Sequence, residues 1–238
     1  MQEDIYRNQE ADAFFERCKK NIPTDQSIRN HKETIYSMLK SVLPLQGKKV
    51  LEVGCFIGDL LNKLRNEEKC AVYGIEPSLK ACNYAKDKFN LSIENTTFDK
   101  SKFFGFIPEN KHSFDVIVAE DVLSWMSREV IMQVLSSLDW CLKPGGVLFL
   151  KDYCPTYDFC FRNTHVRNAE VYSYKIAGGH KSFFLMSGIY YVELENITNT
   201  DAFQDSKTNR PDSTLWSNSI LRKVDRPLHP IISMDDIR

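Results

Sequence analysis

The chain of 238 residues lacks any apolar run long enough to cross a bilayer. Its longest uninterrupted apolar runs, such as 147–150, are far shorter than the roughly 20 residues that a transmembrane helix needs. The charged start MQEDIYRNQE also lacks the apolar stretch of a signal peptide. We therefore expect a cytoplasmic protein without membrane insertion.

An excess of charge of one sign is also missing. Lysine and arginine total 31 against 32 aspartates and glutamates, which gives a formal net charge of −1. Such a balance creates no overall field that would attract a polyanion. On this ground we expect no nucleic acid among the partners.

The cysteines lack the spacing of a metal or disulfide framework. There are seven of them, without a CxxC pair and without the partnered Cys/His spacing of zinc sites. We expect reduced thiols and no metal site. Internal repeats and low-complexity linkers are missing too, which favours one folding unit.

What the sequence does contain is a repeated alternation of strand and helix patterns. Short β-branched or apolar segments alternate with segments of helical periodicity, and Lys143-Pro144-Gly145-Gly146 ends the last of these helices. Two later segments, 189–197 and 217–225, are typical of an antiparallel strand pair. The pattern predicts an open α/β sheet with helices on both faces. The expected parallel strands are 48–53, 71–75, 91–98, 114–119 and 147–153.

A glycine loop follows the first expected strand, where an open α/β sheet binds ligands. Gly54 and Gly58 let the backbone turn tightly and approach a ligand. A dinucleotide fingerprint would need glycines where Phe56 and Asp59 stand, and Asp59 would repel a pyrophosphate. Glu76, after the second strand, can accept hydrogen bonds from a ribose. The combination favours a nucleoside without phosphates over NAD or FAD.

Four motifs carry a resemblance to a known family. The runs VLEVGCFIGDLL, YGIEPS, FDVIVAEDVLSWM and CLKPGGVLFL resemble class I S-adenosylmethionine-dependent methyltransferases, in detail over about residues 45–152. The resemblance implies an enzyme with a Rossmann-like seven-stranded sheet whose last strand is antiparallel, and S-adenosylmethionine as its cofactor. It also implies a domain over 47–238, preceded by a helical cover at 1–46.

The resemblance assigns cofactor-binding roles by motif. It puts the methionine part of the cofactor in the glycine loop, the ribose at the second strand end, the adenine at the third and the sulfonium at the fourth. Phe56 departs from the family, which commonly has a glycine there. The cofactor-binding residues implied are Arg17, Glu52, Gly54, Cys55, Phe56, Gly58, Glu76, Pro77, Phe98, Asp99 and Glu120.

The aromatic and basic segment 152–180 is the expected substrate-binding insertion. It resembles methyltransferases encoded with bacterial surface and capsular polysaccharide genes, some of which act on phosphoramidate groups. Two arginines and a histidine within residues 162–167 predict a small anionic acceptor, because guanidinium groups match phosphate oxygens bidentately. We expect O-methylation of this acceptor, with Tyr153, Arg162 and Arg167 binding it.

The expected substrate-binding segment also contains a candidate general base, a histidine. An alcohol acceptor would need a base, for which His165 is the candidate, with Asp152 or Tyr153 orienting it. His180, on a Gly-Gly turn, is expected to be exposed. The alternatives are a catalytically silent S-adenosylmethionine-binding regulator or scaffold and a nicotinamide-dependent oxidoreductase. The oligomeric state is left open.

Overall fold

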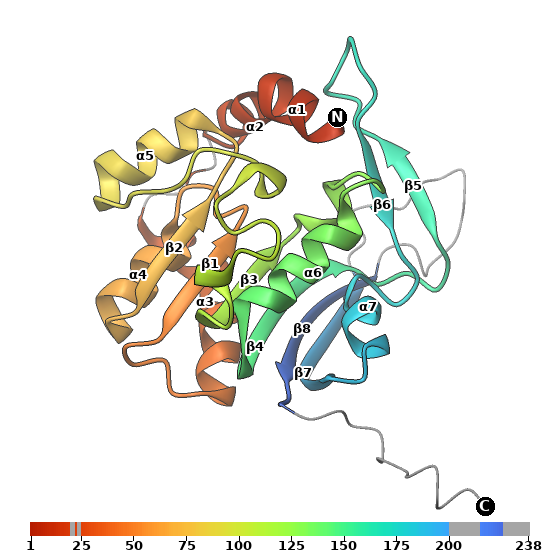
Figure 1. Cartoon of the computed structure of the whole chain (residues 1–238). Coiled ribbons are helices and arrows are strands. Elements are labelled where there is room, and N and C mark those ends of the chain that lie inside the picture. Colours follow the sequence, from red (N-terminus) through yellow and green to blue (C-terminus); the bar gives the residue numbers. More distant parts are fainter. Residues whose placement is uncertain (20–21, 23–24, 200–214, 226–238) are drawn as a thin grey trace, which may run out of the picture.

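A six-stranded sheet in the order β2-β1-β3-β4-β8-β7 forms the centre of the computed structural model, which describes residues 1–19, 22, 25–199 and 215–225 (Figure 1). β1, β2, β3 and β4 are parallel, whereas β8 runs antiparallel to both of its neighbours. The expected antiparallel pair at the end of the chain is confirmed. The strands are β1 Lys49–Val53, β2 Ala71–Ile75, β3 Phe114–Glu120, β4 Leu142–Tyr153, β7 Tyr190–Asn199 and β8 Leu215–Lys223.

The expected strand 91–98 is reduced to one parallel bridge between Ile75 and Glu94. Beyond this bridge the side-chain amide of Asn95 donates to the backbone oxygens of Glu76 and Pro77, each at 3.0 Å. These two oxygens lie beyond the end of β2, so a side chain replaces the backbone as hydrogen-bond partner directly after the bridge. Within the described residues the central sheet therefore has six strands where seven were expected, although the predicted fold class is confirmed.

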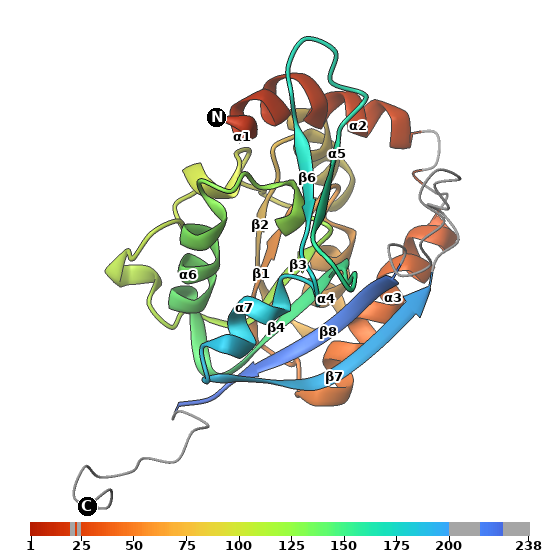
Figure 2. The same ribbon diagram turned by 90° about the vertical axis from the view of Figure 1, so that its right-hand side faces the viewer.

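Helices cover both faces of the sheet (Figure 2). Along β3, Val116 and Val118 pack in the cluster that includes α3 and α4, whereas Ile117 and Ala119 pack in the cluster that includes α6 and α7. Successive strand residues point to opposite faces, so a continuous apolar run is needed where both faces are covered. None of the described helices combines the length and apolarity of a membrane span. The helices of the two faces are α3 Asp25–Val42, α4 Asp59–Glu68, α5 Leu79–Phe89, α6 Ile131–Cys141 and α7 Lys181–Met186.

The first three helical elements lie across the carboxyl ends of the strands (Figure 1). They are α1 Gln2–Ile5, the π-helical η1 Tyr6–Glu10 and α2 Ala11–Cys18, called here the roof helix. Asp12 ties one end to the start of α5 by accepting from the Ser78 hydroxyl at 2.7 Å and from the Lys80 amide at 3.1 Å. The 3₁₀ turns are η3 Phe98–Lys100, η4 Pro108–Asn110 and η5 Leu123–Trp125.

A separate two-stranded hairpin stands beside the roof helix. It consists of β5 Phe159–Arg162 and β6 Tyr172–Lys175, both within the segment expected to be an insertion. The side chain of Gln2 joins hairpin and roof, because its oxygen accepts from the Tyr172 amide at 2.9 Å and its nitrogen donates to the oxygens of Tyr172 and Trp125 at 2.8 and 2.7 Å. The sequence predicted no strands here.

We expect Phe149→Ala to lower the free energy of unfolding by between about 3 and 5 kcal/mol, because it empties a fully buried site between sheet and helices. Met132→Ala on the exposed side of α6 is the control and should change it by less than about 0.5 kcal/mol. Denaturant titration measures both values. Equal losses in the two variants would contradict the assignment of the core.

Candidate active site

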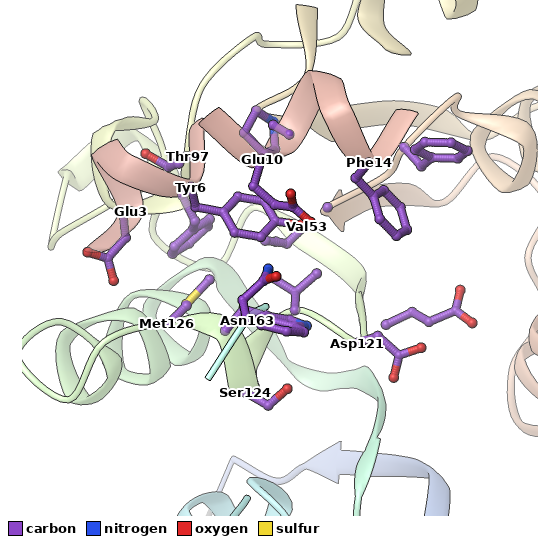
Figure 3. Close-up of a pocket in the computed structure, with 18 of the residues that line it drawn as sticks. Glu3, Tyr6, Glu10, Phe14, Val53, Thr97, Asp121, Ser124, Met126 and Asn163 are labelled. Carbon is purple, nitrogen blue, oxygen red and sulfur yellow. The ribbon is translucent and has the colours of Figure 1, made fainter. Parts of the chain in front are cut away.

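A cavity of about 1480 Å³ opens at the carboxyl ends of the parallel strands, under the roof helix (Figure 3). Ligand pockets usually measure about 300–1,000 Å³, so this one has room for two ligands side by side. Its walls run from the glycine loop after β1 to the β5–β6 hairpin. Of the predicted cofactor-binding residues, the cavity is lined by Arg17, Gly54, Phe56, Glu76, Pro77, Phe98, Asp99 and Glu120.

The glycine loop is fixed by close packing. The Gly54 amide donates to the Ile75 oxygen at 2.8 Å, and a Cβ at Gly54 would stand 2.3 Å from a methyl carbon of Val122. Phe56 has a left-handed φ of 49°, which costs a non-glycine residue about 1–2 kcal/mol. Its ring packs on Phe14 of the roof helix at 5.7 Å, so the loop and the roof hold each other. Cys55 and Gly58, although predicted, do not line the cavity.

Glu76 stands at the end of β2, where its carboxylate accepts the amides of Phe56 and Ser78, both at 2.9 Å. Burial raises its pKa to about 7. Each carboxylate oxygen keeps a second lone pair, and the side chain lines the cavity. The arrangement can receive both hydroxyls of a ribose.

Asp99 supplies the clearest sign of a missing hydrogen-bond donor. Both of its carboxylate oxygens are buried, and neither finds a hydrogen-bond partner within the described part of the chain. The buried ring of Phe98 adjoins it in the cavity wall. Buried carboxylates without partners are costly, so a ligand with an amino group, such as adenine, fits this corner.

A buried network of charges forms the floor near the ends of β1 and β3. Lys32 lies 3.3 Å from Glu52 and also pairs with Glu120, whose other oxygen accepts from Lys151 at 2.9 Å. Burial raises the pKa of Glu52 to about 8 against the opposing effect of Lys32. Lys151 also pairs with Asp121 at 3.2 Å. Glu52 itself is covered by this network and does not line the cavity.

Sequence reasoning missed Lys32. It shares one face of α3 with Ile35, Tyr36 and Leu39, and all four are buried. A lysine at i relative to apolar residues at i+3, i+4 and i+7 stands on the core side of a helix. This pattern was the available signal, because a buried lysine needs carboxylate partners.

The roof helix adds an ion pair over the cavity. Arg17, predicted to face the cofactor carboxylate, is engaged by Glu10, which is 2% exposed. Figure 3 shows Glu10 and Tyr6 projecting from the roof toward the cavity. Both belong to the π-helical turn, a feature frequent at functional sites. Binding of the cofactor carboxylate by Arg17 stays a prediction. It requires the guanidinium to contact that carboxylate together with Glu10 or in place of it.

The hairpin side of the cavity is aromatic. Tyr153, at the end of β4, stacks on Trp216 with ring centroids 4.0 Å apart. Trp125 and Phe161 meet edge to face at 5.9 Å. Lys175 lies among these rings and lines the cavity with them. We call the set of Trp125, Tyr153, Phe161 and Lys175 the acceptor compartment.

The structure separates the predicted basic residues. Arg162 and His165 line the cavity mouth with exposed side chains, whereas Arg167 is exposed and lies outside the cavity lining. Among the residues that the structure describes, Arg162 donates to the Ala169 oxygen alone, at 3.5 Å. The two arginines therefore form no joint anion clamp inside the cavity, and their roles stay predictions.

His180 is buried, so the expectation of an exposed histidine is wrong. Its ring pairs with the buried Asp152 of β4, so this carboxylate, predicted to orient His165, is engaged by His180. The cause is the glycine turn: a Cβ at Gly179 would stand 3.1 Å from the Tyr153 oxygen. This close approach packs the turn against β4 and carries His180 inward.

Comparisons with known proteins agree on the chemistry. Residues 51–148 match the model of a family described as a methyltransferase domain. A tRNA N(3)-cytidine methyltransferase METTL2 of Danio rerio is 32% identical over 118 residues, which cover 44% of this chain and 31% of the relative. The tRNA N(3)-methylcytidine methyltransferase trm141 of Schizosaccharomyces pombe is 25% identical over 155 residues, covering 60% and 58%. The chain thus spans less than two thirds of these relatives.

Solved structures share the fold at low sequence identity. Magnesium protoporphyrin IX methyltransferase of Synechocystis PCC 6803, solved with bound S-adenosylmethionine, has a TM-score of 0.61 and 16% identity over 94% of this chain and 98% of its own. An N-methyltransferase 2 of Haemonchus contortus, in complex with phosphomonomethylethanolamine and S-adenosylhomocysteine, has a TM-score of 0.64 and 13% identity, covering 94% and 60%.

The predicted enzyme class and cofactor, an S-adenosylmethionine-dependent methyltransferase domain, are confirmed by these comparisons. The prediction that excluded nucleic acid is wrong, because relatives that share this domain are named as tRNA methyltransferases. Net charge sums over the whole surface and does not describe the few contacts of a local binding site.

Lowering the pH through about 7 is expected to weaken cofactor binding, because it protonates Glu76 and removes acceptor capacity from its carboxylate. Glu76→Gln should lower the affinity for S-adenosylhomocysteine by between about 10- and 100-fold and abolish this pH dependence. Titration calorimetry between pH 6 and 8.5 measures both effects. The exposed Glu16→Gln is the control, and an unchanged affinity in Glu76→Gln would contradict the ribose assignment.

Asp99→Asn should move stability and affinity in opposite directions. Without ligand, the neutral amide removes an unpartnered buried carboxylate and raises the melting temperature. With S-adenosylhomocysteine, affinity falls because an acceptor of the adenine amino group is weakened. Thermal denaturation with and without ligand measures the pair of shifts. Asp87→Asn, exposed on α5, should change neither, and tighter binding by Asp99→Asn would refute the adenine assignment.

Proposed function

We propose that this chain transfers a methyl group from S-adenosylmethionine to a nucleobase of an RNA, with tRNA as the first candidate. The observation that carries the proposal is the acceptor compartment. Its aromatic rings line the same cavity as the proposed cofactor cradle, which consists of the glycine loop, Glu76 and Asp99. The relatives named as tRNA methyltransferases support the same acceptor class.

The acceptor compartment suits a flat, unstacked ring. Enzymes that modify a base remove it from its stack and hold it between aromatic and apolar side chains. Stacking a base on an aromatic side chain contributes about 1–3 kcal/mol. Trp125 and Phe161 come from different elements and meet at 87°, so they can offer a base both an edge and a face.

The exposed basic residues of the hairpin are better placed to bind RNA phosphates at the mouth of the cavity than an anion inside the cavity. Arg162 and His165 stand on the rim, and Arg167 lies farther along the same loop. Phosphate contacts position a nucleic acid without reading its sequence. His165 would act as the predicted general base only if the acceptor atom must lose a proton.

The mechanism follows from positioning. When bound, S-adenosylmethionine supplies a methyl group on a positively charged sulfur. Glu120 and Asp121 at the end of β3 provide negative charge in a buried setting, which favours a cation there. The roof helix excludes water, and the rings of the acceptor compartment align the attacking atom, which accelerates the transfer through proximity.

Incubation of the purified chain with methyl-tritiated S-adenosylmethionine and tRNA should give a labelled nucleoside after digestion. Parallel reactions contain phosphate, phosphoramidate and sugar phosphate acceptors. Label only in these small molecules would overturn the proposal and favour O-methylation of a small anionic acceptor, such as a capsular precursor. Cofactor binding without any transfer would favour a silent S-adenosylmethionine-binding protein.

The double variant Arg162→Ala/Arg167→Ala should raise the KM for tRNA and leave the affinity for S-adenosylhomocysteine unchanged. Each lost phosphate contact lowers the slope of log affinity against log salt by about 1. Filter binding at several salt concentrations measures the slope, with Lys86→Ala on α5 as the control. An unchanged slope would remove the hairpin loop from the RNA path.

A further inference from the structure

Lys175 of β6 is a buried amine that the cofactor site does not use. It is 2% exposed and lines the cavity. Its Nζ lies 3.7 Å from the centroid of the Tyr153 ring, 5.3 Å from that of Phe161 and 5.9 Å from that of Trp125. Three different elements, β4, β5 and η5, thus surround one ammonium with π-systems, which attract a cation.

Lys175 lacks the carboxylate partner that buried lysines normally have. Its Nζ donates to the Ser124 hydroxyl at 2.8 Å, but it forms no ion pair with a carboxylate of the described residues. Asp121 is occupied by Lys151 at 3.2 Å, and Asp152 by His180. Both carboxylates face Lys175 only at longer range, and burial lowers its pKa to about 8 against their effect.

The described residues therefore do not use all the donors of this ammonium. An ammonium has three N–H groups, of which one is taken by Ser124 and one faces the Tyr153 ring. Figure 3 places Ser124 below the cavity, across from the roof residues Tyr6 and Glu10. The remaining donor is available on a side chain that lines the place of the acceptor.

We propose that Lys175 is the acceptor-recognition residue, whose ammonium donates a hydrogen bond to a carbonyl or anionic oxygen beside the methylated atom. This inference rests on the proposed function and narrows its substrate class to bases that carry such an oxygen. The aromatic rings hold the plane of the base, and the ammonium fixes its rotation within that plane. The amine takes up no proton from the acceptor in this role.

The direction of the pH dependence follows from the charge. The ammonium loses its proton as the pH rises through about 8, so the hydrogen bond to the acceptor is weakened above this value. Tyr153 stays uncharged, because burial raises its pKa. A lysine acting as a base would give the reverse, with turnover rising through the same interval.

The test uses the complete chain with saturating S-adenosylmethionine and tRNA between pH 6.5 and 9. Lys175→Met keeps the length and apolar stem, and it should raise the KM between about 10- and 100-fold with kcat nearly unchanged, as expected for the loss of a charged hydrogen bond. Lys175→Arg retains a charge that does not titrate in this range, so the rise of KM above pH 8 should disappear.

Lys111→Met is the matched control, because its Nζ also lies over a ring, 4.8 Å from the Trp140 centroid, but outside the cavity. It should leave KM and kcat unchanged. Affinity for S-adenosylhomocysteine should be the same in all variants, which also shows that they fold. If Lys175→Met does not fold, the profile of Lys175→Arg decides.

Two results would overturn the inference while the proposed function stands. They are an unchanged KM in Lys175→Met, and a loss confined to kcat in an enzyme whose turnover rises through pH 8. An unmodified chain that methylates no tRNA would instead remove the proposed function and this inference with it.

Discussion

The site depends on keeping carboxylates buried at the carboxyl edge of a parallel sheet. Glu52 and Glu120 end neighbouring strands, and without cations between them their burial and mutual repulsion would be prohibitive. Lys32 from α3 contacts both carboxylates, and Lys151 from β4 adds a second cation beside Glu120. Helix packing and sheet order therefore serve the same electrostatic requirement, because moving Lys32 away would leave Glu52 buried without its cation.

The sheet was predictable from the sequence wherever the pattern was local. Apolar runs predicted β2 at its observed bounds and β1, β3, β7 and β8 within two residues. β4 begins at Leu142, five residues before its predicted start at 147, and includes the segment 143–146 that was expected to precede it. The early end of the expected strand 91–98 was not predictable in this way. The backbone of Glu94 pairs with Gly74 and Glu76, but the next residue, Asn95, uses its side chain to bind the Glu76 and Pro77 oxygens beyond β2. Competition between a side chain and a strand depends on three-dimensional placement.

Most residues predicted to bind the cofactor line one cavity, whereas no pattern in the sequence indicated the aromatic residues and the lysine on its other side. The glycine loop and Glu76 follow parallel strands in sequence, so their convergence results from the parallel topology. Asp99 follows the single bridge between Ile75 and Glu94, which runs parallel beside them. Lys175, Trp125 and Phe161 come from an insertion and a 3₁₀ turn with no periodic pattern. In that segment the predicted residues were arginines and a histidine, which the structure exposes. Lys175 was not predicted, because its burial cannot be inferred from the sequence pattern.

The side chain of Gln2 connects both halves. One amide joins the roof helix, on one side of the cavity, to the backbone of Tyr172 and Trp125 on the hairpin side. A ligand that orders the roof helix is therefore expected to order the hairpin as well. The loss of conformational entropy on ordering is then divided between the binding of the cofactor and the binding of the acceptor. Cofactor and acceptor are thus expected to bind with positive cooperativity, and thermodynamic linkage makes the factor equal in both directions.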